Sequence, residues 1–364
     1  MRKEKKRSVA ILGATGMVGR RFAELLINHP WFELVMLVGD KSVNEGYESV
    51  WKRKEAQLQR HYGGDSWFVR PFPEALKEAR VSSFEELLNS TSVDLVFSSI
   101  QASFGHLESE LLNKGFTVIS NSPYRRLEEG VPLIVTEING NLIEDQQYIK
   151  NPNCVTSGLA LTVAPIAQRF GLKEVSVVTF QSLSGKGDAK YPRDLVVGNI
   201  YSLHGSEERT EEFIVGEIQK LFRDQIAISV SCNRVFVQEG HLVDVKLKTV
   251  ERISGVDEVI GAFREFDPLR HLGLPSGGHR PLLVTAERGR PRPRQDASHG
   301  NGFTVCVGGI YVEDRIYDLR YQFVVNNVVR GAAGGAILNA EMYHLRSLCG
   351  KNNKSGESYR PSYK

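Results

Sequence analysis

The sequence lacks the features that define several classes of protein. Its 364 residues include only four cysteines, and no two of them have the C-x-x-C spacing of a structural zinc site. No apolar run approaches the ~18 residues of a membrane-spanning helix, and the apolar segment after the basic N-terminus is too short for a signal peptide. The net charge of +3 is too small to indicate a nucleic-acid partner. We therefore expect a cytoplasmic protein with no metal, membrane or nucleic-acid partner, in which a functional cysteine is reactive rather than disulfide-bonded.

The first 150 residues alternate short apolar strands with helices, which is typical of a parallel sheet covered on both faces. The expected strands are residues 8–12, 32–38, 93–98 and 117–120, and the expected helices are 20–29, 81–88 and 105–113. The polar, aromatic-rich segment 40–72 has no pattern that predicts an element.

From residue 154 onward the pattern changes to an α+β one. A helix is expected at residues 155–168, followed by strands at 175–181, 227–231, 234–237, 242–248 and 302–307. These predict one mostly antiparallel sheet with helices on one face. The glycine- and alanine-rich start of a final helix, 331–348, permits close packing against the first domain. We expect the polar tail, 351–364, to be disordered.

Three glycines, Gly13, Gly16 and Gly19, lie between the first strand and the first helix. Glycines at this point permit a tight turn and a close approach of pyrophosphate to the backbone, and the helix N-terminus attracts the phosphates. This context predicts a Rossmann-like dinucleotide-binding domain. The second strand ends in Gly-Asp-Lys-Ser, so that Asp40 suits the ribose hydroxyl of NAD, and Lys41 with Ser42 suits the 2′-phosphate of NADP. With arginines opening the first helix nearby, we expect NADP, with NAD as the alternative.

Cys154 follows Asn-Pro-Asn and begins an apolar helix. A helix N-terminus favours a thiolate, so we expect this position to lower the thiol pKa and to make Cys154 a nucleophile. Asn153 beside it has an amide that can donate to a developing oxyanion. The alternative is a buried structural cysteine, which is what we expect of Cys232, Cys306 and Cys349.

Arg234 and His241 bracket a loop between two expected strands. Two polar side chains in this arrangement can converge on one ligand, the arginine on a carboxylate and the histidine in proton transfer. The alternative is that both are solvated loop residues.

Taken together, these segments resemble the aspartate-β-semialdehyde dehydrogenase family, in its archaeal and fungal branch. The motifs that carry the resemblance are ordered along nearly the whole chain. They are GATGMVGRRF at 13–22, HPWFEL at 29–34, SN…RR…VPL at 120–133, KNPNC at 150–154, TFQSLSGKG at 179–187, R-x6-H at 234–241, RPRPR at 290–294, GNG at 300–302 and VRGAAGGAILNAE at 329–341.

The resemblance implies the NADPH-dependent, reversible reduction of L-aspartyl-4-phosphate to the semialdehyde and phosphate, through a thioacyl intermediate on Cys154. It implies that His241 is the acid/base, that Gln181 orients substrate and thioester, that Arg234 holds the substrate α-carboxylate, and that Arg126 contacts the phosphate. Further substrate contacts are implied at Asn121 and Glu208, and cofactor contacts at Gly13, Thr15, Gly16, Met17, Val18, Lys41, Ser42, Ser184, Gly185 and Asn327. The resemblance also implies a homodimer or homotetramer, in which 1–153 with 332–350 bind NADP and 154–331 form a catalytic and dimerisation domain.

Some positions depart from the family pattern. The family carries a Glu-x-x-Lys pair for the substrate amino group and phosphate, and one alignment places Thr210 and Phe213 there. An alternative register uses Glu207, Glu208 and Arg209 and keeps an acid and a base. Smaller departures are Val155, and Lys186 and Asp188 in the SGxG loop.

Two alternatives therefore remain open at this point. If the first register holds, the enzyme reduces another acyl phosphate or an acyl-CoA thioester, as malonyl-CoA reductase does. A protein of another class, a catalytically inactive nucleotide-binding or redox-sensing protein, has the same fold. The arginine-rich run 288–294 is expected to be a solvated or interface loop rather than a nucleic-acid site.

Overall fold

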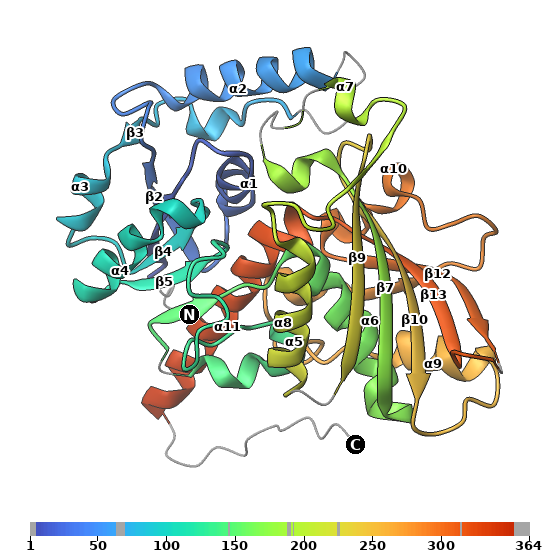
Figure 1. Ribbon diagram of the computed structural model, residues 1–364. Coiled ribbons are helices and arrows are strands. Elements are labelled where there is room, and N and C mark those ends of the chain that lie inside the picture. Colours follow the sequence, from blue (N-terminus) through green and yellow to red (C-terminus); the bar gives the residue numbers. More distant parts are fainter. Residues whose placement is uncertain are drawn as a thin grey trace.

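Two β-sheets organise the chain in a computed structural model that describes residues 5–62, 70–144, 146–187, 191, 193–223, 226–313 and 315–352 (Figure 1). The first sheet has six strands in the order β3-β2-β1-β4-β5-β6, and every pair is parallel. This order reverses direction at β1, which is the topological switch point of a Rossmann sheet and the place where such sheets bind nucleotides. The predicted Rossmann-like fold is therefore confirmed. The strands are β1 (Arg7–Leu12), β2 (Phe32–Val38), β3 (Val81–Ser82), β4 (Leu95–Ser98), β5 (Thr117–Ser120) and β6 (Tyr148–Lys150).

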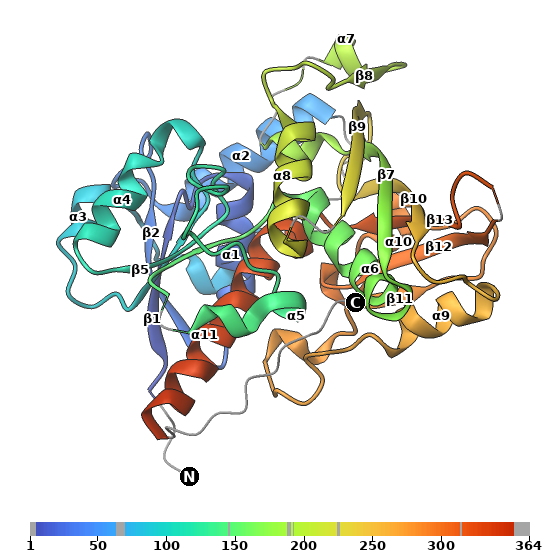
Figure 2. The same ribbon diagram turned by 60° about the horizontal axis from the view of Figure 1, so that its bottom comes forward.

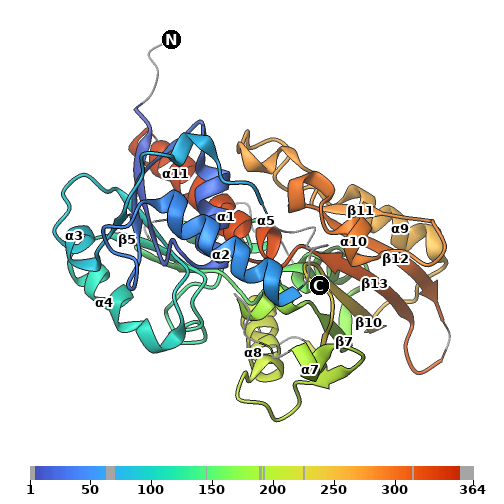
Figure 3. The same ribbon diagram turned by 90° about the horizontal axis from the view of Figure 1, so that it is seen from above.

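Helices cover both faces of this sheet because its strands are apolar on both sides. Val9 and Ile11 face one core, with α1, α2 and α11, whereas Ala10 and Leu12 face another, with α3 and α4. Figure 3 looks down on α1 and α2, which lie side by side. The helices are α1 (Met17–Leu26), α2 (Tyr47–Tyr62), α3 (Phe84–Leu88), α4 (His106–Asn113), α5 (Thr136–Asn139) and α11 (Gly334–Asn352).

The second sheet has seven strands in the order β11-β12-β13-β10-β7-β9-β8. It is mixed and mostly antiparallel, as predicted, with parallel pairs only at β11/β12 and β7/β9. The strands are β7 (Leu172–Gln181), β8 (Ile200–Ser202), β9 (Ala227–Val235), β10 (His241–Thr249), β11 (Leu282–Val284), β12 (Val305–Val312) and β13 (Leu319–Val325). The helices of this half are α6 (Cys154–Phe170), α7 (Arg193–Val196), α8 (Thr210–Phe222), α9 (Val256–Glu265) and α10 (Pro293–Asp296).

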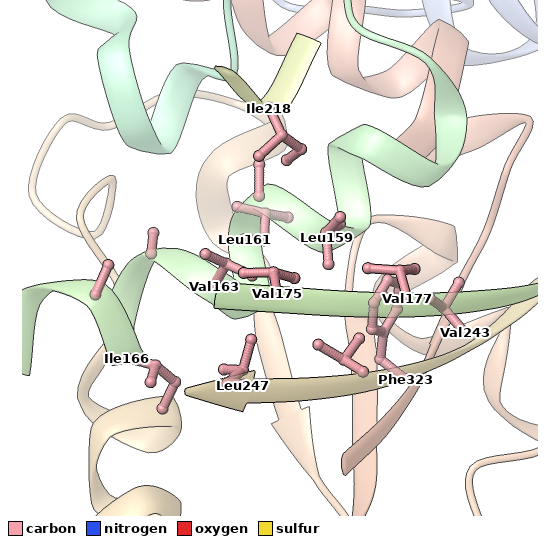
Figure 4. Close-up of a cluster of buried hydrophobic side chains, with 14 of the residues drawn as sticks. Leu159, Leu161, Val163, Ile166, Val175, Val177, Ile218, Val243, Leu247 and Phe323 are labelled. Carbon is pink, nitrogen blue, oxygen red and sulfur yellow. The ribbon is translucent and has the colours of Figure 1, made fainter. Parts of the chain in front are cut away.

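The long helix α6 packs on one face of this second sheet. Figure 4 shows Leu159 and Val163 of α6 beside Val177 and Val175 of β7, with Val243 of β10 and Phe323 of β13 in the same cluster. These strand residues alternate with half-buried ones, because successive side chains of a strand point to opposite faces. One face of the sheet therefore forms the core, and whatever shares that face lies beside α6.

The chain returns to the first sheet at its end, since α11 crosses beneath it and contacts β5 and α5 (Figures 1 and 2). A single π-helical turn, Val329–Ala333, precedes α11 and packs against the start of α6. Helix α11 extends to Asn352, and the remainder of the predicted tail, 353–364, lies outside the described residues. In the described ranges no helix has both the length and the apolar character needed to cross a membrane.

Several expected elements were wrong in type or extent. Residues 81–88 are not one helix, because Val81 and Ser82 pair with β2 and Ser83 then starts α3 with a capping box to Glu86. The two strands expected within 227–237 are the single strand β9. The unassigned segment contains α2, and β13 had no prediction although it lies in the middle of the second sheet.

Candidate active site

Three polar side chains share the core face of the second sheet at one of its ends. Gln181 at the end of β7 pairs directly with Arg234 of β9, and His241 begins β10 on the other side of β7. All three are at most 2% exposed. Because α6 covers the same face with its N-terminus at this end, its first residue, Cys154, lies over them. The predicted convergence of Arg234 and His241 is therefore what the structure shows, and neither is a solvated loop residue.

A cavity of about 240 Å³ opens beside Cys154, between segments of the two sheets. Its walls bring together many of the residues singled out in the sequence, from both halves of the chain. The lining includes Val18, Asn121, Arg126, Asn153, Cys154, Gln181, Ser184, Gly185, Glu208, Arg234 and Asn327, with Lys186, Thr210 and Phe213. Of the other cofactor residues, Gly13, Thr15, Gly16, Met17, Lys41 and Ser42 lie outside this cavity, on the nucleotide-loop side of the first sheet.

The thiol and the imidazole are in direct contact. Sγ of Cys154 lies 3.1 Å from Nε2 of His241, and the backbone N–H of Ser182 donates to Nδ1 of the same ring at 3.0 Å. Because a backbone N–H can only donate, Nδ1 must accept, and the neutral ring carries its proton on Nε2. His241 therefore donates to the sulfur, and the thiol proton points to Oδ1 of Asn153, 3.8 Å away.

Asn153 has two tasks at the start of α6. Its Oδ1 accepts from the backbone N–H of Val155 at 2.8 Å and so caps the helix, and its own backbone N–H donates to Oε2 of Glu217 at 2.6 Å. The side-chain NH₂ is the part of Asn153 that can donate into the cavity.

The electrostatics of the resting site favour neutral groups. Burial raises the pKa of Cys154 to about 11, although Arg234 and the N–H of Val155 act in the opposite direction. Burial, with the positive charge of Arg234, also holds the pKa of His241 well below its usual range. The expectation that the helix N-terminus lowers the thiol pKa is therefore wrong for the free protein, because desolvation of the thiolate outweighs the charge of Arg234 and the N–H of Val155 at the start of α6.

This pKa predicts how fast Cys154 reacts with iodoacetamide. Only the thiolate attacks, so its rate of alkylation, followed by mass spectrometry of the Cys154 peptide, should rise about tenfold per pH unit from pH 7 to 10. A thiolate–imidazolium pair would instead react at a nearly constant rate from pH 6 to 9. Cys232 and Cys306 serve as internal controls, since both are buried as predicted and burial raises their pKa values to about 11 and about 12. The side chain of Cys349 lies outside the described residues.

Buried donors point to an anionic ligand. Nδ2 of Asn121, Nε of Arg126 and Nε of Arg234 are buried and have no hydrogen-bond partner within the described residues. Each belongs to a residue that lines the cavity. Buried donors without acceptors are costly, by about 1–3 kcal/mol each, so a ligand that supplies oxygen acceptors is favoured here.

Glu217 connects this anion site to the cysteine, and sequence reasoning missed it. Its carboxylate accepts from Nη1 of Arg126 at 3.0 Å and from the backbone N–H of Asn153 at 2.6 Å. The sequence feature that could have identified Glu217 is an acid that falls with Ile214 and Ile218 on the apolar face of α8. In the structure this acid is fully buried. Ser182 was also missed, although its backbone N–H sets the tautomer of His241.

The two alignments of the Glu-x-x-Lys pair have different outcomes. Thr210 and Phe213, the two positions of the first alignment, both line the cavity. Because neither side chain is charged, this alignment places no acid or base there. In the second, Glu208 also lines the cavity, but Arg209 lies outside it, is 66% exposed and pairs with Glu212. The acid is thus present and the adjacent base is not. Lys186 lines the cavity, whereas Asp188 lies outside the described residues.

The glycine loop has the shape that a dinucleotide requires. Gly13 has a left-handed φ of 86°, and Gly16 is the N-cap of α1 with no side chain above the free N–H groups. A Cβ on Gly19 would lie 2.1 Å from the carbonyl oxygen of Gly13, so only glycine permits this contact of helix and strand. The residues present therefore fit the phosphates of a dinucleotide.

The region after β2 carries the groups expected for a 2′-phosphate. Lys41 is exposed there, and Ser42 accepts from Nη2 of Arg53, in α2, at 3.2 Å. Arg20 and Arg21 do not reach this place freely, because they are engaged with Glu55 and Glu24 respectively.

The arginine-rich run, 288–294, contacts the buried carboxylate of Asp296. Asp296 accepts from the side chain of Arg290 and from the backbone N–H of Arg292, and lies 3.2 Å from Nε2 of His299. With Cys306 these residues form a group of metal-ligand type within the described chain, but Arg290 already neutralises the carboxylate.

Comparison with known proteins agrees with this geometry. A family model described as semialdehyde dehydrogenase, NAD binding domain, matches residues 8–146, and one described as semialdehyde dehydrogenase, dimerisation domain, matches residues 163–330. The aspartate-semialdehyde dehydrogenase of Archaeoglobus fulgidus is 34% identical over 92% of this chain and 97% of its own. The malonyl CoA reductase (NADP) of Metallosphaera sedula is 30% identical over 92% of this chain and 95% of its own. The solved structure of aspartate semialdehyde dehydrogenase with NADP from Candida albicans superposes with a TM-score of 0.79 and 26% identity, over 94% of this chain and 100% of that one. The chain belongs to the semialdehyde dehydrogenase family.

Proposed function

We propose that this protein catalyses the reversible, NADPH-dependent reduction of L-aspartyl-4-phosphate to L-aspartate 4-semialdehyde and phosphate. The observation that carries the proposal is the contact of 3.1 Å between Sγ of Cys154 and Nε2 of His241. It lies beside a cavity whose lining residues include buried donors that have no acceptor within the described residues. Relatives at 30–34% identity that carry this enzyme's name support it.

Cys154 is the nucleophile of the proposed reaction. Its sulfur forms a C–S bond with the acyl carbon while the bond from that carbon to the phosphate oxygen breaks, and phosphate leaves with the electron pair. Arg126 and Asn121 hold the departing phosphate, and Gln181 and Asn153 position the acyl oxygen. His241 supports this step as a donor, since its Nε2–H stabilises the thiolate and then the oxygen that becomes negative. Because the free thiol is protonated, this step releases one proton, and the departing phosphate takes it up and leaves as HPO₄²⁻.

NADPH fits the site on this chain's own residues. Gly13, Thr15 and Gly16, with Met17 and Val18, would hold the pyrophosphate, and Lys41 with Ser42 the 2′-phosphate. Ser184, Gly185 and Asn327 would hold the nicotinamide end beside Cys154. When bound, the cofactor would supply a hydride to the thioester carbon, so that the C–S bond breaks and Cys154 is left as the thiolate.

The same proposal covers the organisation of the chain. Residues 1–153 with 332–350 would bind NADP, and 154–331 would form the catalytic and dimerisation domain of a cytoplasmic homodimer or homotetramer. The description of the second matching family model as a dimerisation domain supports the assembly.

A second candidate is the reduction of an acyl-CoA thioester such as malonyl-CoA. Two observations favour it: the Metallosphaera relative, and the uncharged Phe213 in the cavity wall where the family has a lysine.

A steady-state assay of the wild-type protein separates the two candidates. With aspartate semialdehyde, phosphate and NADP, we expect formation of NADPH that depends on phosphate and falls at least tenfold with NAD. With malonyl-CoA and NADPH we expect no oxidation of the cofactor. The opposite result in both reactions would overturn the proposal in favour of the thioester.

A further inference from the structure

Five polar side chains form a hydrogen-bond network at the carboxyl ends of three neighbouring strands of the first sheet. Ser98 of β4, Ser120 of β5 and Lys150 of β6 are paired in register, so that they form a row across the sheet. Glu108, in the first turn of α4, contacts all three, and Tyr148 of β6 completes the network. The row and Glu108 are fully buried. An acid and a base are thus paired inside the end of the parallel sheet.

The two charged groups of this buried network have a full set of partners. Nζ of Lys150 donates to Oε2 of Glu108 at 3.0 Å and to Oγ of Ser120 at 2.7 Å, and its third bond is to the hydroxyl of Tyr148 at 2.9 Å. Oε1 of Glu108 accepts from the hydroxyls of Ser98 and Ser120, both at 2.6 Å. A buried ion pair is often no more stabilising than an apolar pair of the same size. A role in fixing geometry therefore explains these charges better than a role in stability.

The buried network lies where two segments of the active site begin. Ser120 is followed by the turn 121–126, which contains the buried donors without acceptors, Nδ2 of Asn121 and Nε of Arg126. Lys150 is followed by 151–154, which ends at the nucleophile. The residues of these two segments that line the cavity are Asn121, Pro123, Arg126, Pro152, Asn153 and Cys154, and none of the five network residues is in the lining. The network therefore lies behind the site and does not touch a ligand.

Ser120 connects the two charged groups to the turn. Its Oγ donates to one of them, accepts from the other, and also accepts the backbone N–H of Ser122 at 3.0 Å. From the segment after β6, Nδ2 of Asn151 donates to Oδ1 of Asn121 at 2.9 Å. This bond orients the amide of Asn121 and leaves its own Nδ2 to a ligand.

We propose that Glu108 and Lys150 are positioning residues for the phosphate of the reaction, and that they act through Ser120 on the turn 121–126. The charged pair fixes the serine hydroxyl, the hydroxyl fixes the start of the turn, and the turn presents its free donors to the anion. The inference rests on the proposed function, in which phosphate binds at this turn, and it adds the groups that hold the turn in place.

The protonation of Lys150 makes this support dependent on pH. Burial lowers the pKa of Lys150 to about 8, and Arg126 and Arg125 act in the same direction, whereas Glu108 opposes them. Tyr148 stays a neutral donor, because burial and the charge of Glu108 raise its pKa. Only the ammonium form of lysine has three N–H donors for the three acceptors. The free protein loses this proton as the pH rises through 8, so the positioning should be complete at pH 7 and lost at higher pH.

The first test compares two serines that make the same bond. Ser120→Ala and Ser98→Ala each remove a hydroxyl that donates to Oε1 of Glu108 at 2.6 Å, but only the hydroxyl of Ser120 also contacts the turn. With inorganic phosphate as the probe, in calorimetry of the free protein at pH 7, we expect Ser120→Ala to raise Kd about tenfold and Ser98→Ala to change it less than about twofold. In the enzyme assay KM for phosphate should follow Kd, while KM for NADP and kcat at saturating phosphate stay near wild type.

The second test removes both charges together. The double variant Glu108→Gln with Lys150→Met leaves no unpaired charge in the core, so we expect it to fold. Its Kd for phosphate should be about tenfold above that of the wild type at pH 7. At pH 9.5 this ratio should fall below about twofold, because Lys150 of the wild type has then lost its proton. Titration of phosphate itself affects both proteins equally and cancels in the ratio.

Three results would overturn the positioning role. If Ser98→Ala raised Kd as much as Ser120→Ala, the network would only support the sheet. If the ratio between the double variant and the wild type stayed constant from pH 7 to 9.5, the ammonium group of Lys150 would not hold the turn. A wild-type protein that binds no phosphate would remove the anion site itself. In contrast, a protein that binds phosphate with the expected pattern but does not turn over aspartate semialdehyde would overturn the proposed function alone.

Discussion

Replacing Cys154 with alanine is expected to lower kcat by about 10⁴-fold or more, the largest effect of any single change in this site. Without the sulfur no thioester forms, so the hydride of the cofactor has no thioester to reduce. The arginines of the anion site remain, so KM for phosphate and the binding of NADP should stay close to wild type. The assay is the phosphate-dependent reduction of NADP with aspartate semialdehyde, together with NADP binding by fluorescence titration.

Two variants make this result specific. Cys154→Ser keeps the shape of the site with a much weaker nucleophile and should be nearly as inactive. Cys306→Ala removes a buried thiol of β12 that lies outside the cavity, so it should keep its kcat while losing some stability. Activity of Cys154→Ala within tenfold of the wild type would show that the thiol is not the nucleophile, and would favour a nucleotide-binding protein without this chemistry.

The parts of the site that could be predicted are those fixed by local rules. A strand followed by Gly13 and Gly16 and then a helix specifies a phosphate-binding turn with no long-range information. Cys154 at a helix start follows from the Asn-Pro-Asn that precedes an apolar run. The common face of Gln181 and Arg234 follows from the two-residue period of strands, once their pairing is known.

The rest depends on contacts between distant segments. Helix α2 was not recognisable because its sequence is mostly polar, and its apolar residues Trp51 and Leu58 are buried in two different clusters with segments that are distant in sequence. The shift of the Cys154 pKa was predicted in the wrong direction. The helix start is visible in the sequence, whereas the burial that raises the pKa is not. In the sequence, Lys186 is only a departure from the SGxG motif. Its position near Glu208 follows from contacts between segments that are distant in sequence.

Replacing Gly331 with alanine is expected to lower kcat about 100-fold, although Gly331 carries no functional group. A Cβ at this position would lie 2.6 Å from Cβ and 2.8 Å from Cα of Cys154. The π-helical turn cannot move away easily, because Arg330 holds it through two hydrogen bonds to Glu137, of 2.7 and 2.5 Å. Cys154 is also held, since it is the first residue of the buried helix α6. The start of α6 must shift, and a displacement of about 1 Å at a reacting atom is enough for a 100-fold loss.

The matched substitution is Gly261→Ala in α9, where the nearest atoms to the new Cβ lie 3.9 Å away. Alanine there should leave kcat unchanged and raise the free energy of unfolding by about 0.5–1 kcal/mol, since it favours a helix over glycine. Gly331→Ala should instead lower that free energy by about 1–3 kcal/mol, as overpacking does. Its effect on kcat should persist at temperatures where the variant is fully folded, which separates displacement of the nucleophile from unfolding. Wild-type kcat in folded Gly331→Ala would mean that the sulfur tolerates the shift, so that the close contact of the π-helical turn with Cys154 serves packing alone.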